Sequence, residues 1–174
     1  NPVVMLEHKG LYWSKVPGTK GAQTVEPDRD YVLPFGQARY ALEADPDPVE
    51  RGESLCVITY GVGVYWATNA AESHPGQVTV VDLRTLHPLD METVTEAVKT
   101  HNKCLVLTEE QIENSFARNL AGLISEECFQ WLDAPVFSMG AESLPAIPLN
   151  IKLEEAMLPD SEKVATRIGE VLHY

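Results

Sequence analysis

The sequence predicts an α/β protein in which helices cover both faces of a mostly parallel sheet. From residue 53 onward, short apolar runs of strand length alternate with longer amphipathic stretches of helix length. Hydrophobic residues make up 44% of the 174 residues, which is enough for a buried core. Alternation of strands and helices at this rhythm is typical of parallel sheets with two helical layers.

The first regular elements follow residue 53. Residues 55–60 form an apolar run typical of a strand buried on both faces. Residues 62–73 are expected to form a helix, and residues 78–83 the next strand. Asp90 is placed to cap a helix that ends near His101, because an aspartate side chain can accept the free N–H groups of a first turn.

The second half repeats the pattern. Residues 104–108 predict a third buried strand, and apolar residues at helical spacing predict a long helix over 115–132. Residues 135–139 predict a fourth strand. Ser161 is expected to cap the last helix.

The N-terminal part is patterned differently. Residues 1–6 are apolar and predict a buried strand, yet a lone strand cannot be stable, so we expect the chain to begin inside a larger protein. Residues 7–52 are rich in proline and glycine, as linkers are, and the boundary of the main domain is expected within 15–50. The acidic run 43–50 predicts a solvated loop.

Composition excludes several classes of function. The chain has 13 basic and 26 acidic residues, a formal charge of −13, which argues against binding to nucleic acid or to an anionic membrane surface and suits a basic partner. No apolar run of transmembrane length occurs. The three cysteines have neither disulfide-framework nor zinc spacing, which predicts core thiols in a reducing cytoplasm.

Polar residues at the expected strand ends are the first place to look for chemistry, because ligands of open α/β sheets bind there. Asp82 and Arg84 are expected to pair and brace the loop that follows. Glu109 and Glu110 could form a general-acid pair, but a solvated acidic loop is the favoured interpretation. Gly61 and Gly63 match only half of a dinucleotide-binding fingerprint, so a tight turn is expected instead. The residues alone therefore predict no self-contained active site.

Several motifs carry a resemblance over nearly the whole chain. They are, in order, the first seven residues with Leu11-Tyr12, Ile58-Thr-Tyr-Gly61, residues 81–90, Asn114-Ser-Phe-Ala117, Leu132-Asp-Ala-Pro-Val136 and Val171-Leu-His-Tyr174. In this order the motifs resemble the beta subunit of thiamine-diphosphate-dependent 2-oxo acid dehydrogenases. The longer stretches of sequence around these motifs are most similar to bacterial enzymes that fuse the alpha and beta subunits into one chain.

The resemblance implies a three-layer α/β/α transketolase C-terminal-like domain. Its sheet should have five strands, with one antiparallel strand from about residues 37–43. It also implies three parts: residues 1–14 as the last strand and exit of a pyrimidine-binding domain, 15–36 as a linker, and 37–174 as the C-terminal domain. The complete enzyme would decarboxylate a 2-oxo acid, with branched-chain acids favoured, on thiamine diphosphate and pass the acyl group to a lipoyl arm. Magnesium and the cofactor would bind upstream, so this segment is expected neither to bind the cofactor nor to turn over alone.

Four positions match family sites. Asp133 and the Tyr174 carboxylate fall where beta subunits grip the basic subunit-binding domain of the lipoyl acyltransferase, from whose arginines carboxylates can accept charge-assisted hydrogen bonds. A loop cap before Pro135 is the alternative for Asp133. Asn1 falls where a backbone carbonyl binds potassium in some relatives, and His8 is a candidate for the wall of the substrate channel, with an exposed loop as its alternative. A homodimer or an α2β2-like assembly, including the remainder of the chain, is implied.

Two other interpretations stay open. One is the C-terminal domain of a transketolase or deoxyxylulose-phosphate synthase relative, which would have no acyltransferase partner. The other is a non-catalytic regulatory module that binds a ligand at the strand ends.

Overall fold

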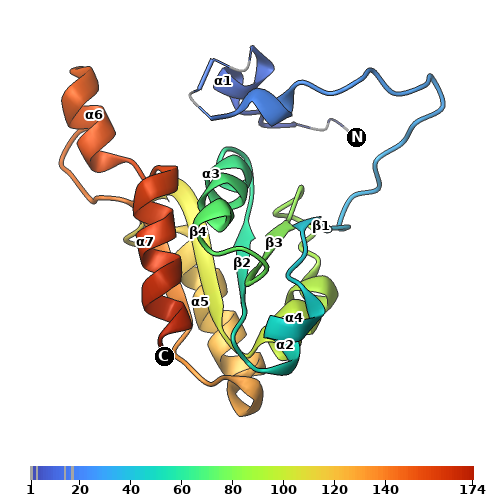
Figure 1. Cartoon of the computed structure of the whole chain (residues 1–174). Helices are drawn as coiled ribbons and strands as arrows, with labels where there is room; N and C mark the ends of the chain where they lie inside the picture. The colour runs from blue at the N-terminus through green and yellow to red at the C-terminus, as the bar shows by residue number, and fades with distance from the viewer. Residues whose placement is uncertain (1, 3, 14, 17) are drawn as a thin grey trace.

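The computed structural model describes residues 2, 4–13, 15–16 and 18–174. Its centre is a five-stranded sheet in the order β1-β3-β2-β4-β5 (Figure 1). The strands are β1 (Arg39–Leu42), β2 (Leu55–Thr59), β3 (Val78–Asp82), β4 (Cys104–Gln111) and β5 (Phe137–Ala141). Only β1 pairs antiparallel, against β3, and the other neighbours are parallel. The expected mostly parallel sheet with one antiparallel strand is confirmed.

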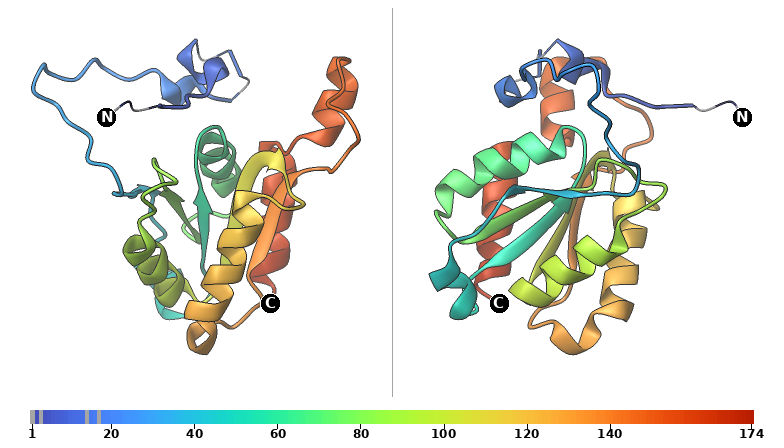
Figure 2. Two further views of the ribbon diagram at one scale, coloured as in Figure 1. Left: turned by 180° about the vertical axis from the view of Figure 1, so that it is seen from behind. Right: turned by 90° about the vertical axis from the view of Figure 1, so that its right-hand side faces the viewer.

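Each face of the sheet has its own hydrophobic core, because successive side chains of a strand point to opposite faces. Leu55 and Val57 of β2 pack with helices α3 and α7, whereas Cys56 and Ile58 pack with α4 and α5. The right-hand view of Figure 2 shows these two helical layers on either side of the sheet. The helices are α3 (Gly63–Ala70), α4 (Met91–His101), α5 (Phe116–Glu127) and α7 (Ser161–Leu172).

Of the two predicted helix N-caps, one is confirmed and the other is wrong. Asp90 caps α4 as expected, accepting a hydrogen bond from the Thr93 backbone N–H at 3.1 Å. The cap of α7 was wrongly predicted: Asp160 accepts from the Lys163 N–H at 2.8 Å, and Ser161 is the first helical residue. Asp160 has the extended backbone that an N-cap needs, with φ of −146°.

Other elements are shorter than expected or were not expected. The long helix predicted over 115–132 ends at Glu127, and Phe129–Trp131 form a 3₁₀ turn after it. Two short helices have no clear sequence pattern, α2 (Pro46–Glu50) in the expected acidic loop and α6 (Ile151–Met157), which projects from the body in Figure 1.

The N-terminal segment runs across the end of the molecule where the parallel strands finish (Figures 1 and 2). It contains a short helix, α1 (Lys9–Tyr12), and a 3₁₀ turn, Lys20–Ala22. The described residues among 1–6 form no strand, and Val4 and Leu6 are 85% and 92% exposed. The described residues of this segment pair with none of the five strands. Within the described residues, every helix is too short or too polar to cross a bilayer.

Candidate functional site

A hydrogen-bonded cluster lies at the carboxyl end of β2 and β4. The Tyr60 hydroxyl is 2.8 Å from the Thr108 hydroxyl and donates to the Glu110 carboxylate at 3.0 Å. That carboxylate also accepts from the backbone N–H of Phe116 at 2.9 Å, where α5 begins. Burial raises the pKa of Tyr60 to about 12, so its hydroxyl stays protonated at neutral pH. The cluster therefore braces the start of α5.

Glu109 turns to a different partner. Its carboxylate lies 2.9 Å from Nε2 of His8, 101 positions away in sequence, and the contact joins the N-terminal segment to the end of β4. Since Glu109 and Glu110 contact separate groups, they do not share a proton as a general-acid pair would. His8 is thus half-buried against the end of β4.

The pairing predicted between Asp82 and Arg84 is wrong. Asp82 binds the guanidinium of Arg39, with Nε to Oδ2 at 3.1 Å, because the antiparallel register sets these two residues opposite each other. Arg84 contributes only its backbone N–H, at 3.1 Å from Oδ1, and has a left-handed φ of 57°. Arg39 is the partner of Asp82 because of the antiparallel register of β1 and β3. This register cannot be deduced from the spacing of residues in the sequence.

The glycines after β2 make a tight turn, as expected. Gly61 has a φ of 57°, which favours glycine, and a Cβ on Gly63 would collide with the Thr59 side chain. These glycines therefore serve close packing of α3 on the sheet.

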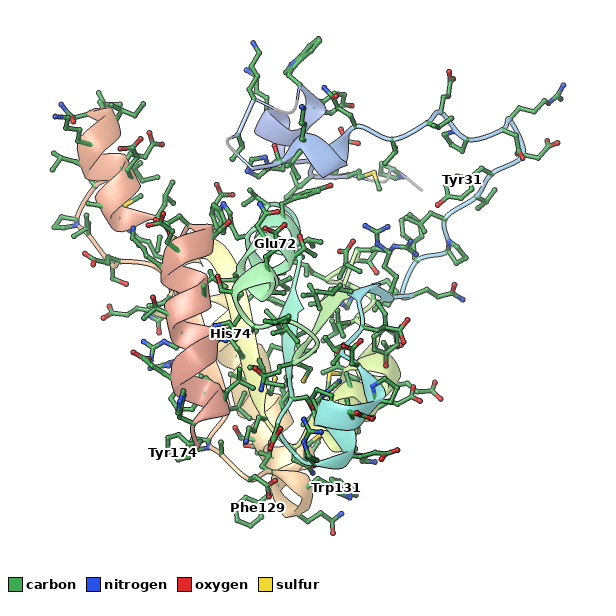
Figure 3. The ribbon with its side chains drawn as sticks, viewed as in Figure 1. Tyr31, Glu72, His74, Phe129, Trp131 and Tyr174 are labelled. Carbon is green, nitrogen blue, oxygen red and sulfur yellow. The ribbon has the colours of Figure 1, made fainter. Side chains whose placement is uncertain are left out.

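Asp133 and Tyr174 lie at the opposite edge, where the parallel strands begin. Asp133 is exposed and its backbone N–H donates to the Asn102 carbonyl at 2.9 Å, just before β4. Tyr174 is 66% exposed, and its ring meets that of Phe137, the first residue of β5, at 5.7 Å between centroids. Figure 3 places Tyr174 at the same end of the molecule as Phe129 and Trp131. The structure thus brings both predicted partner-binding residues to one edge, far from His8.

Two residues that sequence reasoning missed hold this edge together. Asn102 also donates its side-chain amide to the Trp131 carbonyl at 2.5 Å, and the neighbouring Lys103 donates to the Leu172 carbonyl at 3.3 Å. An asparagine directly after a predicted helix is a known end signal, and it could have marked the turn. Asn1, the candidate potassium ligand, lies outside the described residues.

Comparison with models of protein families shows to which family the chain belongs. Residues 47–164 match the family model described as transketolase, C-terminal domain. The chain belongs to this family. The match covers the whole sheet except β1, and it includes Asp133 but neither His8 nor Tyr174.

Beta subunits of 2-oxo acid dehydrogenases are among the similar proteins. The 2-oxoisovalerate dehydrogenase subunit beta of Bacillus subtilis (strain 168) is 34% identical over 177 residues, covering 100% of this chain and 50% of the relative. The pyruvate dehydrogenase E1 component subunit beta of Rickettsia conorii is 33% identical, covering 100% and 49%. The chain therefore spans about half the length of these curated relatives.

A solved structure has the same fold. The chain titled "Split gene transketolase, inactive beta4 tetramer" superposes with a TM-score of 0.66 at 19% identity, covering 84% of this chain and 45% of that one. At this identity the likeness concerns the fold alone.

Proposed function

We propose that this chain is the C-terminal assembly and partner-docking domain of a thiamine-diphosphate-dependent 2-oxo acid dehydrogenase. Its partner is the basic subunit-binding domain of a lipoyl acyltransferase. The observation that carries the proposal is the position of Asp133 and Tyr174, which are exposed at one end of the sheet in a chain of charge −13. A carboxylate on such a surface can accept charge-assisted hydrogen bonds from arginines, and the net charge speeds encounter with a basic partner.

The reaction of the whole enzyme belongs to the same proposal. It is the decarboxylation of a 2-oxo acid, with a branched-chain acid favoured by the name of the Bacillus subtilis relative, followed by transfer of the acyl group to lipoyl. The remainder of the natural protein would supply the rest of an α2β2-like assembly or homodimer.

The residues of this chain do not fit the diphosphate or its magnesium ion. Three or more His, Cys, Asp or Glu side chains gather nowhere among the described residues as a metal site would need. The sequence also has no Gly-Asp-Gly motif of the kind that holds a diphosphate and its metal. We therefore propose that the cofactor binds in the part of the enzyme that precedes this domain. His8 is proposed to face the substrate channel, and a potassium site at Asn1 stays a proposal.

Reversing one charge at the proposed edge tests the docking function. Asp133→Arg should weaken binding of the acyltransferase subunit-binding domain at least about tenfold, because an arginine would repel the basic partner. The matched control is Glu142→Arg, an equal change of charge at an exposed position after β5, at the other edge. Isothermal titration calorimetry with the natural full-length protein gives both affinities.

Equal affinities for Asp133→Arg and wild type would contradict the position of the docking surface. Absence of binding by the wild-type protein would contradict the docking function itself and favour a transketolase-like enzyme without an acyltransferase partner.

A further inference from the structure

We call the surface that carries Asp133 and Tyr174 the docking edge. The turn between α4 and β4 contacts both the segment of Asp133 and the helix that precedes Tyr174. It consists of Asn102, which has a left-handed φ of 59°, and Lys103, the residue before β4. The backbone N–H of Asn102 donates to the Val98 carbonyl at 2.8 Å, which ends α4 firmly. The Lys103 carbonyl accepts from the Cys56 N–H at 3.0 Å, which joins the turn to β2. The turn is thus fixed to the rigid centre of the sheet.

Asn102 holds the segment that carries Asp133. Its carbonyl accepts from the Asp133 N–H at 2.9 Å, and its side-chain amide donates to the Trp131 carbonyl at 2.5 Å. One residue therefore fixes the backbone at two points, one at Asp133 and one two residues earlier. With both bonds made, the Cα of Asp133 has little freedom relative to β4.

Lys103 holds the helix that carries Tyr174. The residue is only 7% exposed, and its ammonium donates to the Gly52 carbonyl at 3.1 Å and to the Leu172 carbonyl at 3.3 Å. Leu172 is the last residue of α7, whose final carbonyls have no partner within the helix. An ammonium at this position satisfies one of them and complements the negative end of the helix dipole.

Burying an ammonium costs free energy unless it is well hydrogen-bonded. Among the residues that the structure describes, Lys103 forms no ion pair with a carboxylate, and its partners are the two carbonyls. The Lys103 side chain thus joins the end of α7 to Gly52, which precedes β2 in the chain.

We propose that Asn102 and Lys103 are positioning residues for the docking edge: together they fix the backbone that carries Asp133 relative to the end of α7, which carries Tyr174. The inference rests on the proposed docking function and adds how that surface is held. A partner gains affinity when the groups that it contacts are preorganised, because less freedom is lost on binding. Neither residue needs to touch the partner for this.

Lys103→Met tests the positioning role, because methionine keeps most of the apolar stem and removes the ammonium. Binding of the acyltransferase subunit-binding domain to the natural full-length protein should weaken about five- to tenfold, as expected for loss of a hydrogen bond to a charged group. Lys103→Arg keeps a donor in place and should restore most of the affinity. Asn102→Gly tolerates the left-handed φ, loses only the amide bond to Trp131, and should cause a smaller loss.

A second background separates positioning from general loss of stability. Tyr174→Ala removes the side chain that lies at the end of α7. In that background, which should itself bind more weakly, Lys103→Met should cause little further loss, because the two changes act on the same part of the docking edge. The proposal fails if Lys103→Met binds like wild type, or if it loses the same factor in both backgrounds.

Amide hydrogen exchange keeps the test decisive if the wild-type protein does not bind the acyltransferase domain. That result would contradict the docking function alone. In Lys103→Met the amides of residues 172–174 should exchange faster than in wild type, and Lys103→Arg should protect them again. Unchanged exchange at these residues would contradict the positioning role itself.

Discussion

At the scale of single residues, buried polar groups in this domain act as joints between elements. His101, the last residue of α4, is 4% exposed and its Nδ1 lies 2.7 Å from the Ser54 hydroxyl, just before β2. Burial lowers the pKa of His101 to about 4, so the imidazole is neutral in the folded protein at neutral pH. In the unfolded chain the same group titrates near its usual value of 6.5.

Stability should therefore depend on pH through His101. Between pH 6.5 and 4 the unfolded chain binds a proton that the folded protein does not, so the free energy of unfolding falls as the pH falls, by on the order of 2 kcal/mol. Urea unfolding at several pH values measures this. His101→Gln should flatten the dependence, whereas the exposed His87→Gln should leave it as in wild type. An unchanged slope in His101→Gln would contradict the assignment.

At the scale of elements, the sequence predicts those strands and helix caps that depend on the pattern of neighbouring residues. The buried strands and the Asp90 cap were found because apolar runs and cap residues are signals carried by neighbouring positions. The short helix α6 was missed because it has no long apolar stripe of helical spacing: Met157 is buried, whereas Ile151 and Leu153 are exposed. At the proposed docking edge the resemblance supplied Asp133 and Tyr174, but Lys103 could not be found, because its partners lie about 50 and 70 positions away in sequence.

The Asp90 cap shows how much one local signal contributes. Its carboxylate accepts from the Thr93 N–H at 3.1 Å and from the Ala38 N–H at 2.8 Å, so it joins α4 to the segment that leads into β1. Although burial opposes it, these hydrogen bonds together lower the pKa of Asp90. The stabilisation is therefore complete above the unfolded pKa and is lost as the pH falls through the lower, folded value.

Replacing the cap should cost stability in proportion to the bonds removed. Asp90→Ala should lower the free energy of unfolding by about 1–2 kcal/mol at pH 7, and Asp90→Asn, which keeps one acceptor oxygen, should cost less. Guanidinium unfolding followed by circular dichroism gives both values. If alanine and asparagine had equal effects, the loss would have to come from the charge and not from the cap geometry.

At the scale of the whole molecule, the net negative charge and the hydrophobic cores lie in the same part of the chain. Residues 1–36 carry four basic and four acidic side chains, so the whole net charge of −13 lies on residues 37–174. Both hydrophobic cores are built from residues 55–171, and from the described part of the N-terminal segment Leu11 and Val16 pack against one of them. The acidic surface and the rigid sheet thus belong to one unit.

A chain cut to residues 37–174 should therefore fold and dock by itself. Losing the partly buried Leu11 and Val16 should lower the free energy of unfolding by only about 2 kcal/mol, with one cooperative transition retained in thermal unfolding. Because the docking edge and the net charge stay intact, affinity for the acyltransferase domain should match that of the full chain, with the same decrease on added salt. Loss of cooperative unfolding would show that the N-terminal segment is part of the folded unit. Weaker binding by a truncated chain that still unfolds cooperatively would place part of the docking surface on residues 1–36.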